Sequence, residues 1–259
     1  MRLYKWWTLL AFKKSFIQIF FIMNNLNNKV AYITGGSKGI GYGIAKILID
    51  NGMRVAITSR TLVDAQQAAK SLTDDASRVL ALQSDVSLLA SETAALKATT
   101  DYFGGLDVLV ANAGVGHFAS IDKLTEAAWK EMIDTNLTGV FNSVKASLDA
   151  LKQSKGYIIT ISSLAGANFF ATASGYNASK FGLVGFSQAI MLDLRQYGIK
   201  VTTIMPGSVA THFDNHVPTD ADAWKIQPED IGEMVLNLLE MNPRTLPSKI
   251  EVRPSIPGK

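Results

Sequence analysis

Tyr176 and Lys180 are two side chains whose types and spacing could carry out proton transfer. They stand four residues apart in a segment with a helical pattern, and on a helix this spacing places both side chains on one face. A free phenol has a pKa of about 10, and a nearby cation lowers that pKa by favouring the phenolate. A tyrosine that serves as acid or base needs such a neighbour. The pair alone is equally compatible with a solvated surface helix.

A glycine-rich turn near the start of the chain predicts a phosphate site. Residues 29–34 form a short apolar run typical of a buried strand, and the turn GGSKGIG of residues 35–41 follows at once. A helical pattern continues to Asn51-Gly52, and a second strand is predicted over residues 54–58. Strand, glycine turn and helix together offer backbone N–H groups and a helix N-terminus to a pyrophosphate. A purely structural turn is the alternative.

The order of the motifs resembles the short-chain dehydrogenase/reductase family. The spacing Thr-Gly-x-x-x-Gly-x-Gly at residues 34–41 and Tyr-x-x-x-Lys at 176–180 are similar to that family, and the resemblance covers residues 29–253. Further motifs in the family's order are Asp85 after an apolar run, Ala111-Asn112-Ala113-Gly114 after a strand, Asn136 in a helical segment, Ser163 upstream of Tyr176, and Pro206-Gly207-x-Val209-x-Thr211. Ala111 departs from the Asn that the family usually has there.

The resemblance implies a single-domain Rossmann-type α/β fold over residues 29–259. We expect a doubly wound parallel sheet of about seven strands with helices on both faces. The alternation of predicted strands and helices along the chain favours the same architecture.

The resemblance also implies an NADP(H)-dependent oxidoreductase that transfers a hydride between the nicotinamide and a carbonyl/alcohol pair. Tyr176 would be the acid or base, and Lys180 would lower its pKa and bind the nicotinamide ribose. Ser163 would hydrogen-bond the substrate oxygen, and Asn136 would hold a water in a proton relay. A turn-capping role for Ser163, a catalytic role for its neighbour Ser162, and a structural amide at Asn136 remain open.

The implied cofactor site is large. It comprises Gly35, Ser37, Lys38, Gly39, Ile40, Gly41, Ser59, Arg60, Asp85, Val86, Asn112, Ala113, Gly114, Tyr176, Lys180, Pro206, Gly207, Val209 and Thr211. An acidic residue after the second strand would suit the ribose 2′-hydroxyl of NAD, whereas Arg suits a 2′-phosphate. Arg60 stands there, no carboxylate follows before Asp64, and Lys38 adds a second cation. This charge pattern favours NADP(H), unless both cations are simply solvated.

The substrate should lie where the loops 115–118, 164–170 and 208 onward meet, outside the carboxyl ends of the strands. The candidate contacts are His117, Phe169, Phe170, His212 and Phe213, and the same loops also offer Phe118 and Val209. Their aromatic and apolar character predicts a pocket for a small ketone or aldehyde, although these side chains could equally pack beneath the loops. The loop before Pro228 is a candidate lid that Trp224 would hold down. The loop histidines have no evident carboxylate partners, so we expect no metal site.

Two other functions remain as alternatives. One is 3-oxoacyl-(acyl-carrier-protein) reductase, whose members commonly carry a carrier-docking Arg where this chain has Leu192. The other belongs to a different class, a non-catalytic NADP(H)-binding sensor or interaction protein. A sensor would not need Ser163, Tyr176 and Lys180 together, which favours the enzyme.

The composition restricts the partners and the chemistry. A chain of 259 residues suits one domain with a single core. The net charge of +3 comes from scattered basic residues, so we expect no nucleic-acid partner. The absence of cysteine excludes disulfides, thiolate metal sites and cysteine nucleophiles.

We expect a cytoplasmic enzyme, since export would separate it from NADP(H). The resemblance implies a homodimer or homotetramer formed through helices 129–151 and 176–196, whose small residues could instead face the sheet.

Residues 1–28 differ from the rest and are predicted to be an N-terminal extension. Their apolar runs 6–12 and 16–23 are divided by Lys13-Lys14, and neither is long enough to span a bilayer. No small-residue cleavage site follows. We favour Met23 as the true start, with no firm membrane association. A membrane-surface segment or a packed helix are the alternatives.

Overall fold

The computed structural model describes residues 26–256, which form a sheet of seven strands that are all parallel. The strands are β1 (Val30–Ile33), β2 (Arg54–Ser59), β3 (Val79–Gln83), β4 (Val108–Ala111), β5 (Tyr157–Ile161), β6 (Lys200–Pro206) and β7 (Lys249–Val252). Their order across the sheet is β3-β2-β1-β4-β5-β6-β7. The chain therefore winds outward in one direction from β1 and then in the other from β4. This confirms the predicted doubly wound α/β fold.

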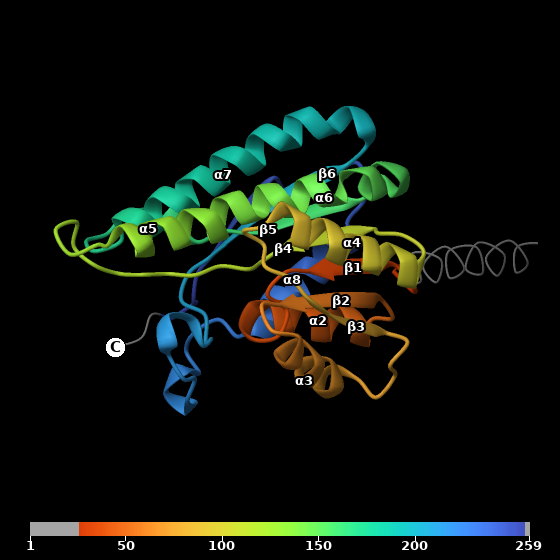
Figure 1. Ribbon diagram of the computed structural model, residues 1–259, viewed down its shortest axis with the longest axis horizontal. Coiled ribbons are helices and arrows are strands. Elements are labelled where there is room, and N and C mark those ends of the chain that lie inside the picture. The colour runs from red at the N-terminus through yellow and green to blue at the C-terminus, as the bar shows by residue number, and fades with distance from the viewer. Residues whose placement is uncertain (1–25, 257–259) are drawn as a thin grey trace, which may run out of the picture.

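Helices cover both faces of the sheet (Figure 1). They are α2 (Gly39–Asp50), α3 (Leu62–Leu72), α4 (Leu89–Phe103), α5 (Glu126–Ile133), α6 (Gly139–Ser154), α7 (Ser174–Leu194) and α8 (Pro228–Glu240). The core on one face is shared by α2, α3 and α8, and that on the other by α4, α6 and α7. A π-helical turn, Asp134–Thr138, joins α5 to α6.

Local sequence signals explain where several helices begin and end. The Thr61 and Thr125 hydroxyls accept backbone N–H groups at the starts of α3 and α5, caps worth about 1 kcal/mol each. Helix α8 begins with Pro228, preceded by a reciprocal pair of hydrogen bonds between Gln227 and Asp230. Helix α4 ends at Gly104, whose φ of 87° few other residues tolerate.

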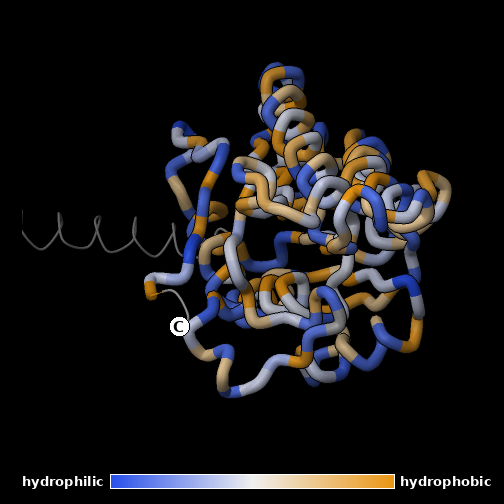
Figure 2. The backbone as a smooth tube through the Cα atoms, turned by 90° about the vertical axis from the view of Figure 1, so that its left-hand side faces the viewer, coloured by the Kyte–Doolittle hydropathy of each residue, from blue (hydrophilic) through white to orange (hydrophobic). Residues whose placement is uncertain are grey.

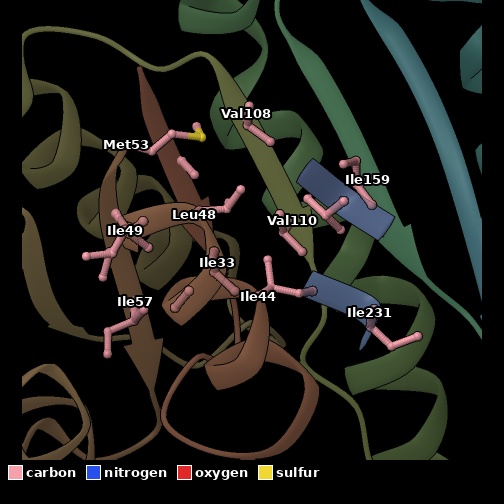
Figure 3. Packing of buried hydrophobic residues seen from close by; sticks show 14 of the residues in the cluster. Ile33, Ile44, Leu48, Ile49, Met53, Ile57, Val108, Val110, Ile159 and Ile231 are labelled. Carbon is pink, nitrogen blue, oxygen red and sulfur yellow. The ribbon is translucent and has the colours of Figure 1, made fainter. Parts of the chain in front are cut away.

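The central strands are apolar throughout because both faces of the sheet are covered. Strand β1 is fully buried. On the α2 and α8 side, Ile33 and Val110 of neighbouring strands pack against Ile44, Leu48 and Ile231 of the helices (Figure 3). Figure 2 shows the backbone from a second side, with hydrophilic and hydrophobic residues alternating along the chain. Because all seven strands are parallel, their carboxyl ends lie along one edge of the sheet.

Residues 26–28 pack against the folded domain, which therefore begins before the boundary predicted at residue 29. Leu26 packs against the core, and the Asn28 N–H donates to the Gly52 carbonyl at 2.8 Å. The predictions for Met23 and for residues 1–22 lie outside the described residues. None of the helices within residues 26–256 has the length and hydropathy that a bilayer crossing requires.

Candidate active site

A cavity of about 2270 Å³ lies along the carboxyl ends of the strands. Its lining includes residues that follow β1, β2, β3, β4, β5 and β6, so it spans the point between β1 and β4 where the strand order reverses. This is the position at which open α/β sheets bind ligands. Residues far apart in the sequence meet there because every parallel strand ends at the same edge.

The glycine turn forms one wall of the cavity and is held by the loop after β4. The Thr34 hydroxyl accepts the N–H groups of Asn112 and Ala113 at 2.9 and 3.0 Å. In return, the Asn112 side chain donates to the carbonyls of Thr34 and Gly35 at 2.9 and 3.1 Å. Gly35 has a φ of 63°, which glycine adopts without strain. The glycine turn and the loop after β4 are therefore held together by hydrogen bonds in both directions.

Gly41 packs beneath the turn and, unlike Gly35 and Gly39, does not line the cavity. A Cβ at this position would lie 2.5 Å from the Gly35 carbonyl oxygen and 2.6 Å from Nδ2 of Asn112. The prediction that Gly41 contacts the cofactor is thus not supported by its placement. Its role in the structure is to let α2 approach the turn closely.

The remaining predicted cofactor residues all line the cavity. They are Gly35, Ser37, Lys38, Gly39, Ile40, Ser59, Arg60, Asp85, Val86, Asn112, Ala113, Gly114, Tyr176, Lys180, Pro206, Gly207, Val209 and Thr211. Within residues 26–256 no side chain caps the first turn of α2, so its backbone N–H groups stay available at the cavity wall. Arg60 is 73% exposed.

Tyr176 and Lys180 lie one turn apart on α7, and both are buried. The Lys180 Nζ atom is 5.8 Å from the centre of the Tyr176 ring and donates to the Ile161 carbonyl at 3.1 Å. Burial lowers the pKa of Lys180 to about 8. Burial also raises the pKa of Tyr176 to about 12, and a hydrogen bond with the Ser163 side chain offsets only part of that rise. The pKa of the phenol is therefore raised and not lowered as the sequence predicted, because desolvation outweighs the effect of Ser163.

Ser163 combines the two roles that the sequence left open. Its hydroxyl accepts the Ala165 N–H at 3.1 Å and so caps the short helix Leu164–Gly166. The same side chain lies within reach of the Tyr176 hydroxyl and lowers the pKa of the phenol. Ser162 instead donates to the Lys180 carbonyl at 3.3 Å, which stabilises the backbone of α7. The geometry thus favours Ser163 over Ser162 as the partner of Tyr176.

Asn136 lies in the π-helical turn and is fully buried. Its Oδ1 accepts the Val115 N–H at 2.8 Å, and its Nδ2 donates to the Val115 carbonyl and to the Ser179 hydroxyl at 2.8 and 3.0 Å. Ser179 in turn donates to the Tyr176 carbonyl at 2.8 Å. The side-chain amide thus positions the loop after β4 and the helix of Tyr176. The water relay expected for Asn136 stays a prediction.

Aromatic rings surround the Tyr176 ring at the other end of the cavity. The ring centres of Phe118 and Phe213 lie 5.4 and 5.6 Å from that of Tyr176, and Phe170 stands 6.0 Å from Phe118. Of the predicted substrate residues, His117, Phe170, His212 and Phe213 line the cavity. Phe118, from the loop after β4, lines it with them. Phe169 does not, and 85% of it is exposed to solvent.

Two loop histidines have carboxylate partners, contrary to the sequence-based expectation. The His117 Nε2 atom contacts Glu131 at 2.8 Å, and His216 Nε2 contacts Asp222 at 2.7 Å. Asp222 also accepts the Lys225 ammonium at 2.6 Å and the Thr219 N–H at 3.0 Å. These contacts hold the pKa of Asp222 well below its usual range. They also fasten the loop that carries Phe213 and Trp224, both of which line the cavity.

The sequence of this chain matches the model of the short chain dehydrogenase family over residues 29–222. The chain belongs to that family. It is 33% identical to an uncharacterized oxidoreductase of Staphylococcus aureus over 234 residues, which are 90% of this chain and 100% of the relative. A 3-oxoacyl-[acyl-carrier-protein] reductase of Vibrio cholerae is 37% identical over 188 residues, covering 72% of this chain and 76% of the relative.

Among solved structures, an alcohol dehydrogenase of the archaeon Thermococcus sibiricus, complexed with 5-hydroxy-NADP, resembles the fold with a TM-score of 0.83. The two chains are 30% identical, and the match covers 88% of this chain and 97% of that one. The motif order of the family indicated most of the residues that line the cavity. It gave no indication of Glu131 or Asp222, because a lone carboxylate in a helix or loop carries no pattern.

Proposed function

We propose that this member of the short-chain dehydrogenase family transfers a hydride between NADP(H) and a carbonyl/alcohol pair. The observation that carries the proposal is the convergence of Ser163, Tyr176 and Lys180 at one cavity, which the glycine turn also lines. A cytoplasmic location is part of the same proposal, since it gives access to NADP(H).

Three features of the cavity suit a nicotinamide dinucleotide. The uncapped N-terminus of α2 offers N–H groups to a pyrophosphate. The positive φ of Gly35 and Gly39 and the small side chains around them allow a close approach to the backbone. Lys38 in the turn and Arg60 at the end of β2 supply cations, which favours a 2′-phosphate. When bound, the nicotinamide supplies the hydride chemistry.

The protein's part in the reaction is to hold the substrate oxygen and move a proton. With a pKa of about 12, the Tyr176 phenol is protonated at neutral pH and can donate to an oxygen that gains negative charge. The buried Lys180 ammonium and the Ser163 side chain lie close enough to stabilise the phenolate that results. In alcohol oxidation, the same groups would act in reverse.

The aromatic wall of Phe118, Phe170 and Phe213 favours a small apolar ketone or aldehyde. Reduction of a carrier-bound 3-oxoacyl ester is the second candidate, which the similarity to the Vibrio cholerae reductase favours. Leu192 weakens it, because this position on α7 is 57% exposed and offers no positive charge to an acidic carrier. Purified protein incubated with NADPH, a panel of carbonyl compounds and a 3-oxoacyl thioester, followed by NADPH absorbance, distinguishes the two.

Tyr176→Phe is the matched variant for that panel. We expect turnover to fall by about a thousandfold or more, because a general acid is lost, while the dissociation constant for NADPH changes little. If the variant keeps most of the activity, the assignment of Tyr176 is wrong. If the wild-type protein binds NADPH tightly but reduces no compound of the panel, the non-catalytic sensor becomes the better explanation.

We also propose assembly as a homodimer or homotetramer through α6 and α7. The small residues Ala178, Gly185 and Ala189 are exposed and do not face the sheet. Phe141 and Phe181 each expose 43% of their surface on the same pair of helices. Exposed apolar and small residues permit close helix contact between subunits. Sedimentation measurements test this proposal, which a purely monomeric protein would contradict.

A further inference from the structure

Glu131 faces the cavity from α5 and contacts two basic groups with its two carboxylate oxygens. Oε2 lies 2.8 Å from Nε2 of His117, in the loop after β4. Oε1 lies 3.7 Å from Nη1 of Arg60, which directly follows β2. All three residues line the cavity. The carboxylate therefore stands beside the cation to which the proposed function assigns the 2′-phosphate of NADP(H).

A carboxylate in this position acts against a phosphate in two ways. It competes for the guanidinium N–H groups of Arg60, and its charge repels the phosphate oxygens. Neither effect applies to the neutral 2′-hydroxyl of NAD(H). We propose that Glu131 is a specificity-determining residue that weakens the discrimination in favour of NADP(H) over NAD(H). This inference rests on the proposed function.

The surrounding contacts keep the Glu131 carboxylate in place. His117 holds one oxygen at 2.8 Å, which limits how far the side chain can turn away from Arg60. The adjacent lysine, Lys130, is engaged in an ion pair with Asp134 one turn further along the chain. Asp85, another carboxylate of the cavity, accepts hydrogen bonds from the N–H and hydroxyl of Ser87. Glu131 thus contacts Arg60 directly, whereas Asp134 and Asp85 are engaged with residues close to them in the sequence.

Loss of the Arg60–Glu131 ion pair should leave the fold intact. The side chains are 73% and 43% exposed, and exposed pairs of this kind contribute little to stability. Glu126 provides a matched control, because it lies in the first turn of the same helix and does not line the cavity. Glu126→Gln removes the same charge from α5 without touching Arg60.

The test measures dissociation constants of the full-length protein for NADPH and NADH by fluorescence titration. We expect Glu131→Gln to tighten NADPH binding about threefold to tenfold, the size expected for release of one partly exposed charge contact. NADH binding should change less than about twofold, since a 2′-hydroxyl carries no charge. Glu126→Gln should alter neither constant. When Arg60 is also changed to Gln, most of the gain in NADPH affinity caused by Glu131→Gln should disappear. A double-mutant cycle of the four proteins measures this coupling.

The opposite results are equally clear. If Glu131→Gln leaves NADPH binding unchanged or weakens it, or tightens NADPH and NADH equally, the inference is overturned while the proposed function stands. If the wild-type protein binds neither cofactor, the proposed function fails together with the inference. A gain in NADPH affinity is a result that a merely structural role of Glu131 would not produce.

Discussion

The ammonium of Lys180 lies 5.8 Å from the centre of the Tyr176 ring, and its hydrogen bond goes to the backbone carbonyl of Ile161. Both side chains are almost completely buried. Burial has opposite consequences for the two groups, because it disfavours whichever form is charged. It lowers the pKa of Lys180 to about 8 and raises that of Tyr176 to about 12. The opposite pKa shifts of Tyr176 and Lys180, together with the residues that line the cavity, predict how activity, stability and cofactor affinity change with pH and with substitution.

Carbonyl reduction should slow as the pH rises through the pKa of Lys180. Below about pH 8 both Lys180 and Tyr176 are protonated, so the phenol can donate its proton beside a cation. Above that value the ammonium becomes neutral and the phenolate loses its stabilising charge. We expect a single descending limb in kcat/KM with a midpoint near pH 8. Lys200→Gln is the control, because burial also lowers the pKa of Lys200, which lies at the start of β6. If the descending limb vanishes in this variant, the limb reports the titration of Lys200 and not of Lys180.

Lys180→Met should abolish activity and raise stability. Burial lowers the pKa of Lys180 from its ordinary value of 10.5 to about 8, so between these values the unfolded chain binds more protons than the folded one. The free energy of unfolding therefore rises with pH across that window, and the full cost of the buried charge is present at pH 7. Removing it should stabilise the fold by about 1–3 kcal/mol. Urea unfolding at pH 7 measures this, with Lys145→Met as an exposed control. An unchanged or lower stability would mean that the ammonium is better solvated than its burial indicates.

Arg60→Asp should weaken NADPH binding much more than NADH binding. The change replaces the cation proposed for the 2′-phosphate with an anion, so we expect a loss of about tenfold to a hundredfold for NADPH. Titration of both cofactors measures it. Arg54→Asp, at the opposite end of β2, should leave the ratio of the two constants unchanged. Equal losses for NADPH and NADH would show that Arg60 does not contact the phosphate.

Gly41→Ala should impair cofactor binding although Gly41 lies outside the cavity. The new methyl group would stand 2.5 Å from the Gly35 carbonyl oxygen, so the turn or α2 must shift. We expect NADPH affinity to fall at least about tenfold and stability to fall by about 1–3 kcal/mol. Gly105→Ala, just before β4, is the control, because a Cβ there meets no atom of the described chain within 4 Å and its φ is not positive. Tight NADPH binding by the Gly41 variant would show that the turn tolerates displacement.

The fold was largely predictable from local patterns. Short apolar runs alternate with helical patterns along the chain, which predicts a parallel, doubly wound sheet. The Rossmann-type fold was implied by the family resemblance. Residues 26–28 fall within the predicted extension because one leucine followed by two asparagines forms no periodic apolar pattern. Their hydrogen bond to Gly52 depends on a partner far along the chain.

The candidate site was predictable only as far as its motifs extended. The spacing of Tyr176 and Lys180 on one helix determined that they share a face, and the glycine turn determined where a phosphate could bind. Both are local properties of a helix and of a strand–turn–helix unit, so the sequence alone determines them.

The tertiary structure decided the properties that arise between distant segments. Burial, rather than spacing, sets the pKa values of Tyr176 and Lys180, and the depth of burial is known only after the helices pack on the sheet. The placement of Phe169 outside the cavity and the contact of Glu131 with Arg60 likewise depend on how loops from different strands meet. The sequence alone determines which side chains are present and how they are spaced along a helix or turn. Burial and contacts between distant segments determine their pKa values and their partners.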